Sequence, residues 1–198
     1  MVALAVALGL SGLVFAVLTR RVVRGDTFGW DASLFRLLDE TSTRVPLDGA
    51  TEVLLALGGE YWDPPPVILV GAALCALLAF GRRRAAVLVA VTVAGAVVVT
   101  NALQPQFARA PLRADLVDLF PSGHATGSLA VVGALVVGLW STRLRWPVTA
   151  FGLLFVVAYG VALVYLRRHY ASDVLAGWCL AVMIVAAFEA VILAHRAK

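Results

Sequence analysis

Long runs of apolar residues set the main constraint on how this chain folds. Six runs stand out, at Val2–Leu18, Pro66–Phe80, Ala85–Leu103, Gly123–Trp140, Pro147–Leu166 and Ser172–Ala194. A helix needs about 20 mostly apolar residues to cross the hydrocarbon core of a bilayer. Inside lipid, a helix lets one segment bond all of its own backbone polar groups. The pattern therefore predicts an all-α, polytopic membrane protein with six transmembrane helices.

The composition supports this fold class. Charged residues make up only 14% of the 198 residues, against about a quarter in soluble domains. The spans and their connections use the whole length, so we expect a single domain over residues 1–198. The first run follows no basic stretch and precedes no clear cleavage site, so we expect a retained span rather than a signal peptide.

The basic residues lie mostly between the apolar runs. The formal net charge is +4, and every basic residue except Lys198 is an arginine. Arginines between spans set topology or contact anionic headgroups. We therefore expect membrane lipids as partners and no nucleic acid.

The longest polar segment separates the first two spans. Apolar residues give it an amphipathic character at two places: Phe35, Leu37 and Leu38, and then Leu54, Leu55 and Leu57. This pattern predicts an interfacial helix or cap, and a solvated loop is the alternative. Two aromatic belts are also expected, with Trp30, Tyr61 and Trp62 on one side and Trp140 and Trp146 on the other.

The arginine count does not orient the protein by itself. If the N-terminus lies inside, the seven inner basic residues are Arg82, Arg83, Arg84, Arg143, Arg145, Arg196 and Lys198. The nine outer ones are Arg20, Arg21, Arg24, Arg36, Arg44, Arg109, Arg113, Arg167 and Arg168. The tally favours an inside N-terminus only if four of the outer arginines are ligands of a functional site.

Three polar stretches fall on one face when six spans alternate. They are Gln104–Phe120, Pro121–His124 and Arg167–Asp173. In the second stretch, Ser122 is a good N-cap candidate, and the helix that follows would present backbone N–H groups and its positive dipole end to an anion. Gly123 allows close approach of a phosphate, and His124 in the first turn is placed to donate a proton.

The third stretch contains a histidine and a carboxylate four residues apart. His169 and Asp173 share a face if a helix starts there. A carboxylate on one imidazole nitrogen fixes the tautomer, leaves the other nitrogen free to attack and stabilises the imidazolium that follows. Alternatively, Asp173 caps the last span beside Ser172.

Four arginines complete this face. Arg109 and Arg113 are four apart, and Arg167 and Arg168 adjoin His169. Guanidinium groups grip a phosphate dianion through paired hydrogen bonds. Lipid headgroups are the alternative partners. The surplus of cations disfavours a metal ion, so no metal or other cofactor is expected.

The segments "FPSGHA" (Phe120–Ala125) and "HYASDVLAG" (His169–Gly177) resemble the second and third signature blocks of the type 2 phosphatidic acid phosphatase family. The resemblance implies a metal-independent lipid phosphatase with six spans and an outward-facing site. It implies that His169 is the nucleophile and forms a phosphohistidine, that Asp173 orients it, and that His124 protonates the leaving oxygen. Ser122 and Gly123 would bind phosphate oxygens.

Part of the family pattern is missing. In the first block, Gln104 stands where the family has Lys, and Arg109 matches an arginine that is often present. Pro111 and Leu112 occupy the positions of the Arg-Pro pair. In the third block, Ala162 and Leu163 replace Ser-Arg.

Two other arginines are positioned to compensate. Arg167 comes one turn after Leu163, on the same face if the helix continues, and its long side chain can reach back to the pocket. Arg113 can replace the displaced arginine. We therefore expect a rewired phosphate site.

The expected activity is hydrolysis of a terminal phosphomonoester or diphosphate on a membrane lipid. Candidate substrates are phosphatidic acid, phosphatidylglycerophosphate and a polyprenyl diphosphate. The alternative is a catalytically altered relative that acts as a lipid-phosphate binder or a phosphotransferase. The expected location is a bacterial plasma membrane, and small residues in the spans leave a homo-oligomer possible.

Overall fold

A computed structural model describes residues 2–26, 28–42, 48–58, 64–107, 109 and 120–196. Every regular element in these ranges is a helix. In chain order they are α1 (Val2–Val23), α2 (Gly29–Ser42), α3 (Asp48–Gly58), α4 (Pro64–Ala79), α5 (Arg83–Leu103), the short 3₁₀ helix η1 (Gln104–Gln106), α6 (Gly123–Gly138), α7 (Arg145–Tyr165) and α8 (Ala171–Arg196). The all-α prediction is confirmed over the described residues.

Four helices are long and apolar enough to cross a membrane: α1, α5 with η1, α7 and α8. The predicted second and fourth spans correspond to α4 and α6, which are apolar but have 16 residues each. At 1.5 Å per residue, such a helix is about 24 Å long, shorter than the ~30 Å hydrocarbon core. The structure thus shows four full-length candidates and two shorter apolar helices.

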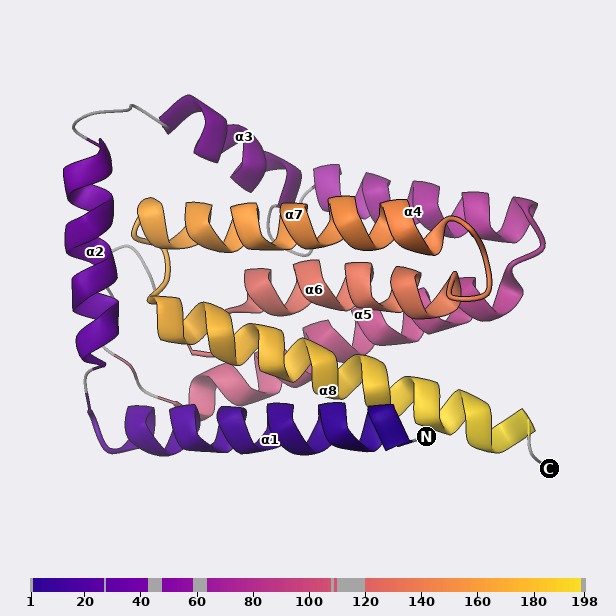
Figure 1. Cartoon of the computed structure of the whole chain (residues 1–198), viewed down its shortest axis with the longest axis horizontal. Helices are drawn as coiled ribbons and strands as arrows, with labels where there is room; N and C mark the ends of the chain where they lie inside the picture. Colours follow the sequence, from indigo (N-terminus) through magenta and orange to yellow (C-terminus); the bar gives the residue numbers. More distant parts are fainter. Residues whose placement is uncertain are drawn as a thin grey trace.

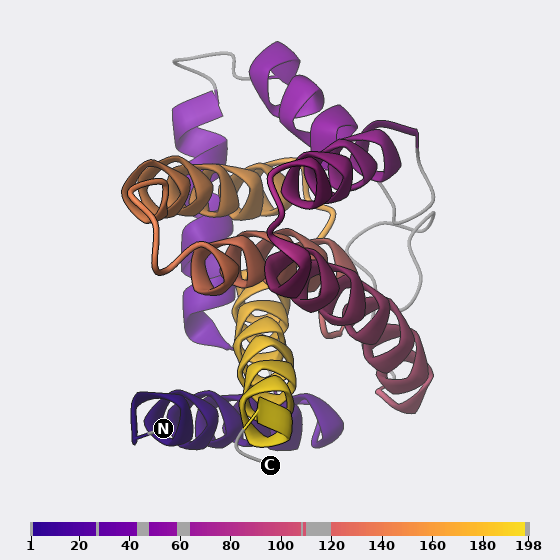
Figure 2. The same ribbon diagram turned by 90° about the vertical axis from the view of Figure 1, so that its right-hand side faces the viewer.

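The apolar helices form one bundle with α8 at its centre. Helix α8 packs against α1, α5, α6 and α7, and the view along the bundle shows α8 between α1 and the other helices (Figure 2). The two termini lie at the same end of the bundle (Figure 1). This arrangement is what an even number of crossings produces.

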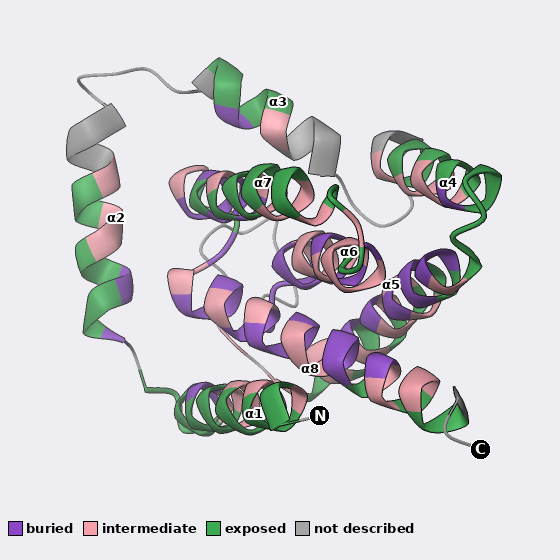
Figure 3. Ribbon diagram, turned by 45° about the vertical axis from the view of Figure 1, so that its right-hand side comes forward, coloured by how far each residue is buried: buried purple, intermediate pink, exposed green. Residues whose placement is uncertain are grey.

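Small residues bring the central helices close together. A Cβ on Gly138 would lie 2.6 Å from the Cβ of Ala85, and one on Gly152 would lie 2.5 Å from a methyl group of Val132. Close backbone approach of this kind is typical of membrane helix interfaces. Buried residues gather on α5, α6 and α8, whereas α1 and α4 are largely exposed (Figure 3), as expected of helices that face lipid.

The segment between the first two predicted spans contains two helices rather than a solvated loop. Helix α2 runs across one end of the bundle, and α3 lies beside α7 (Figure 1). The apolar residues on the inward face of α2 are Leu34, Phe35 and Leu38, which pack on the α7–α8 region. Leu37, which contributed to the amphipathic pattern in the sequence, is exposed and does not belong to this face.

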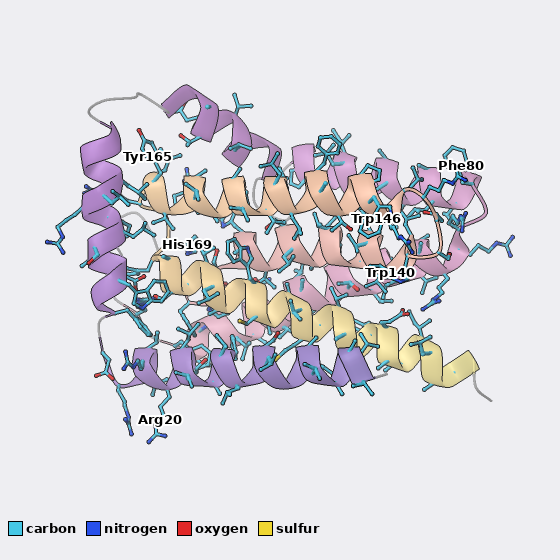
Figure 4. The ribbon with its side chains drawn as sticks, in the orientation of Figure 1. Arg20, Phe80, Trp140, Trp146, Tyr165 and His169 are labelled. Atoms are coloured by element: carbon cyan, nitrogen blue, oxygen red, sulfur yellow. The ribbon has the colours of Figure 1, made fainter. Side chains whose placement is uncertain are left out.

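Exposed tryptophans lie at both ends of the bundle. Trp140 and Trp146 lie at the end far from His169 (Figure 4). Trp30 is exposed on α2, and Tyr61 and Trp62 lie outside the described residues. The described tryptophans of the predicted belts, Trp30, Trp140 and Trp146, therefore fall at two different ends, as the belts require.

Candidate active site

Ser122 is the N-cap of α6. Its Oγ accepts a hydrogen bond from the Ala125 N–H at 3.2 Å, which confirms the predicted N-cap. The Ser122 N–H donates to the backbone carbonyl of Asp173 at 3.1 Å. The two histidine-bearing segments are therefore joined directly through their backbones.

The start of α8 is capped by Asp173. Its Oδ2 accepts the Tyr170 N–H at 2.9 Å, which satisfies one of the unpaired donors of the first turn. The same oxygen lies 3.8 Å from Nδ1 of His169. Asp173 is fully buried. Capping and proximity to the imidazole, treated as alternatives above, are both present.

The two imidazoles lie together. The ring centroids of His124 and His169 are 5.7 Å apart, in an edge-to-face arrangement. His169 is only 5% exposed, and His124 is half-buried. Figure 4 shows His169 at the end of the bundle that α2 covers.

A glycine permits this approach of α8 to α6. A Cβ added to Gly177 would lie 2.6 Å from the carbonyl oxygen of Ser122 and 3.1 Å from the Thr126 N. Both are backbone atoms, so α8 could not sit this close to the N-terminus of α6 with a larger residue at 177.

Arg109 contacts the carboxylate of Asp173 rather than lying open to solvent. Its Nη1 donates to Asp173 Oδ1 and, at 2.8 Å, to Ser172 Oγ. Its Nη2 donates to Asp31 Oδ2 at 3.0 Å. The guanidinium carbon lies 3.9 Å from the ring centroid of Tyr170. A phosphate bound by Arg109 would therefore share a cation that already holds two carboxylates.

Asp31 is the site residue that sequence reasoning missed. Its Oδ1 accepts the Ser172 N–H at 2.9 Å, and its Oδ2 accepts the Ser172 hydroxyl at 2.6 Å. The carboxylate is 4% exposed. The one sequence signal is an acidic residue in the first turn of an amphipathic segment, which does not point to partners 78 and 141 positions away.

Of the remaining predicted phosphate ligands, one is hydrogen-bonded beside the Ser122 cap and two are exposed at a turn. Gln104 donates from Nε2 to the carbonyl of Pro121 at 3.1 Å, directly before the Ser122 cap. Arg167 and Arg168 are exposed at the α7–α8 turn. Arg113 lies outside the described residues.

One geometric prediction about Arg167 is wrong. It required α7 to continue past Leu163 for another turn. Helix α7 instead ends at Tyr165, and Arg167 has a left-handed φ of 54°. Leu163 is fully buried and Arg167 is exposed, so the two do not share one helix face.

In the described residues, no group of three or more His, Cys, Asp and Glu side chains is arranged to hold a metal ion. The groups around the imidazoles are instead a helix N-terminus, an arginine with two carboxylates and two further arginines at the turn.

A family model described as the PAP2 superfamily matches residues 85–196. This range contains both site histidines and more than half of the chain. The chain belongs to the PAP2 superfamily. No curated protein matches it in sequence.

One solved structure shows how far the PAP2 fold extends. The crystal structure of a transmembrane PAP2-type phosphatidylglycerolphosphate phosphatase from Bacillus subtilis is similar to this chain, with a TM-score of 0.66 and 20% sequence identity. The similarity covers 92% of this chain and 95% of that one. The shared fold therefore extends beyond the range that the family model matches. Together with the four helices long and apolar enough to cross a membrane, this similarity makes the protein an integral membrane protein.

Proposed function

We propose that this PAP2 protein is a metal-independent phosphatase that hydrolyses a terminal phosphomonoester or diphosphate on a membrane lipid. The observation that carries the proposal is the 5.7 Å separation of the His124 and His169 rings at the N-terminus of α6. A nucleophile approaches to about 3–3.5 Å, and a general acid lies about 2.6–3.2 Å from the atom it protonates. Two imidazoles this close can act on one phosphoryl group.

In the first step, His169 is the nucleophile. Its Nδ1 is the nitrogen near Asp173, so Nε2 attacks phosphorus. The N–P bond forms while the bond from phosphorus to the lipid oxygen breaks, and His124 as imidazolium donates its proton to that oxygen. Asp173 stabilises the positive charge that develops on His169.

In the second step, water replaces His169 on phosphorus. Neutral His124 accepts a proton from the water as its oxygen attacks. The N–P bond breaks, inorganic phosphate leaves, and both imidazoles return to their starting states. Asp173, whose Oδ2 lies 3.8 Å from Nδ1 of His169, keeps the ring of His169 in one orientation through both steps.

The phosphate oxygens need positive partners. The N-terminus of α6, at Ser122 and Gly123, supplies backbone N–H groups and the positive end of a helix dipole. Arg167 and Arg168 supply charge from the α7–α8 turn, and Arg113 and Gln104 are the proposed contributions of the first block. Arg109 contributes mainly by holding the carboxylate of Asp173.

The likeness in fold selects the first lipid to test. The similar structure is that of a phosphatidylglycerolphosphate phosphatase, so phosphatidylglycerophosphate is the first candidate, followed by phosphatidic acid and a polyprenyl diphosphate. We propose that α4 and α6 complete six spans and that the site faces the outer side of a bacterial plasma membrane. Both short helices are apolar, and the two termini lie at one end of the bundle.

The test is release of inorganic phosphate by purified protein from these three lipids in EDTA. We expect turnover on at least one of them, inhibition by vanadate and an acid-labile phosphoenzyme. The His169→Ala variant should show neither turnover nor phosphoenzyme. Activity that needs added metal, or that survives His169→Ala, would contradict the proposal.

One observation favours a second candidate, a lipid-phosphate binder. Gln104 replaces the family's Lys and donates to the Pro121 carbonyl, and Arg109 already holds Asp31 and Asp173. Saturable binding of the lipids without phosphate release would support this alternative. Phosphate transfer from the phosphoenzyme to an alcohol in preference to water would indicate a phosphotransferase.

A further inference from the structure

Helix α2 contributes a buried carboxylate, Asp31, next to the candidate catalytic pair. Asp31 contacts Arg109 and both the N–H and the hydroxyl of Ser172. We infer that Asp31 is a positioning residue, which holds Arg109 and the start of α8 so that Asp173 stays beside His169. This inference rests on the proposed function.

The backbone contact gives Asp31 a capping role for another helix. The first N–H groups of a helix have no partner within it. Asp173 satisfies the Tyr170 N–H from within α8, and Asp31 satisfies the Ser172 N–H from α2. The two carboxylates therefore fix the first turn of α8, immediately after His169.

The charges explain why two carboxylates are needed. Arg109 lies between Asp31 and Asp173 and bonds to both. Without Asp31, the full attraction of this largely shielded guanidinium would fall on Asp173 alone. Asp173 Oδ2 lies 3.8 Å from His169 Nδ1, which is already longer than a hydrogen bond. A movement of the carboxylate toward Arg109 would therefore weaken its electrostatic contact with the imidazole further.

The position of Asp31 is itself fixed by packing. Four residues after it, Phe35 packs on the α7–α8 cluster, and its ring centroid lies 5.7 Å from that of Tyr170. Phe28, just before α2, is buried and lies under the Arg109 guanidinium at 5.9 Å from its ring centroid. Contacts on both sides of Asp31 thus hold its carboxylate at the start of α8.

The first arm of the test measures turnover. Asp31→Asn keeps the shape and one acceptor for the Ser172 N–H but removes the charge that holds Arg109. We expect kcat to fall about 10- to 100-fold, as misplacement of catalytic groups does, with KM changed less than about twofold because Asp31 does not touch substrate. Asp26→Asn, on an exposed carboxylate nearby, is the matched control and should retain wild-type kcat. Wild-type kcat in Asp31→Asn would overturn the inference.

The second arm does not depend on activity. Asp31→Asn should lower Tm by about 3–10 °C in the wild-type background. In the Arg109→Gln background, the same change should leave Tm unchanged or raise it, because Asp31 and Asp173 then repel each other without a cation between them. Equal Tm losses in both backgrounds would overturn the proposed Asp31–Arg109 link. If the wild type releases phosphate from none of the lipids, the proposed function fails, and this melting cycle still decides the structural link.

Discussion

Arg167 adopts a backbone conformation that arginine rarely takes. Its φ is 54°, and the Arg168 N–H bonds to the Leu163 carbonyl at 2.9 Å while the Arg167 N–H bonds to that of Val164 at 3.0 Å. These bonds form a Schellman turn, in which the left-handed position is usually glycine. A side chain there costs about 1–2 kcal/mol. Because strained residues often lie at functional sites, we propose that the Arg167 guanidinium serves the site beside His169.

We therefore expect stability and activity to change in opposite directions in Arg167→Gly. Glycine takes the left-handed conformation freely, so Tm should rise by about 2–4 °C, as a gain near 1 kcal/mol predicts for a chain of this length. Loss of the proposed phosphate contact should lower kcat/KM by about tenfold or more. Thermal melting and phosphate release on the same preparation measure both.

Arg167→Ala separates the two effects, because it removes the guanidinium and keeps the strained backbone. It should lose activity to the same extent as Arg167→Gly without the gain in Tm. Full activity in either variant would reject Arg167 as a phosphate ligand.

At the level of single residues, the sequence predicts those site residues whose signal lies within a short motif. Ser122 is recognisable as a cap, and His124, His169 and Asp173 stand in short motifs whose spacing predicts one site. Asp31 is not recognisable, because its partners lie 78 and 141 positions away and any surface helix can start with an acidic residue. The turn at Arg167 is also unpredictable, since a left-handed position without glycine carries no sequence signal.

At the level of helices, the contact between α6 and α8 decides how far apart the imidazoles lie. Gly177 lies one turn after Asp173, where a Cβ would meet the carbonyl oxygen of Ser122 at 2.6 Å. The backbone at the start of α6 cannot give way, because Ser122 is tied to Ala125, Thr126 and Asp173. A methyl group at 177 must push the two helices apart.

Gly177→Ala should consequently reduce both stability and turnover. Overpacking typically costs about 1–3 kcal/mol, which corresponds to a Tm loss of about 2–12 °C for a chain of this length. Separation of His124 from His169 should lower kcat by about tenfold or more in the protein that remains folded. Thermal melting and phosphate release per folded molecule are the measurements.

The matched control is Gly71→Ala in α4, where an added Cβ meets nothing within 4 Å. Alanine is favoured over glycine inside a helix by about 1 kcal/mol, so this variant should be at least as stable as the wild type and fully active. If Gly177→Ala behaved like Gly71→Ala, the close approach of α8 to α6 would be wrong.

Helix positions follow from the sequence better than helix ends do. Apolar runs predict all six helices of the bundle, because burial in lipid makes hydrophobicity and length the dominant signals. The ends depend on local contacts: α1 continues to Val23 through Arg20 and Arg21, and α6 ends at Gly138, before Trp140. Cations near a helix C-terminus are favourable, so a basic pair did not mark the end of α1.

At the level of the whole molecule, each end of the bundle is tied by a buried carboxylate and an arginine. Arg109 joins Asp31 and Asp173 at the histidine end, and Arg84 on α5 bonds to Glu189 on α8 near the other end. Exposed arginines also occur at both ends, including Arg20 at one and Arg143 at the other. The distribution of charge therefore does not show which end of the bundle faces outward. Chemical labelling of a residue at each end can show this.

We expect the histidine end to face outward in cells. In a background with Cys75 and Cys179 replaced by Ala, Asp26→Cys places an exposed thiol between α1 and α2, and Ser141→Cys places one in the turn between α6 and α7. A membrane-impermeant maleimide should label the first in intact cells and the second only after permeabilisation, because four of the proposed six spans precede Ser141 and one precedes Asp26. The cysteine-free protein is the control. The reverse pattern would place the site inside. Only an odd number of crossings between the two positions puts them on opposite sides of the membrane. Labelling of both thiols in intact cells would therefore mean that α4 or α6 does not cross it.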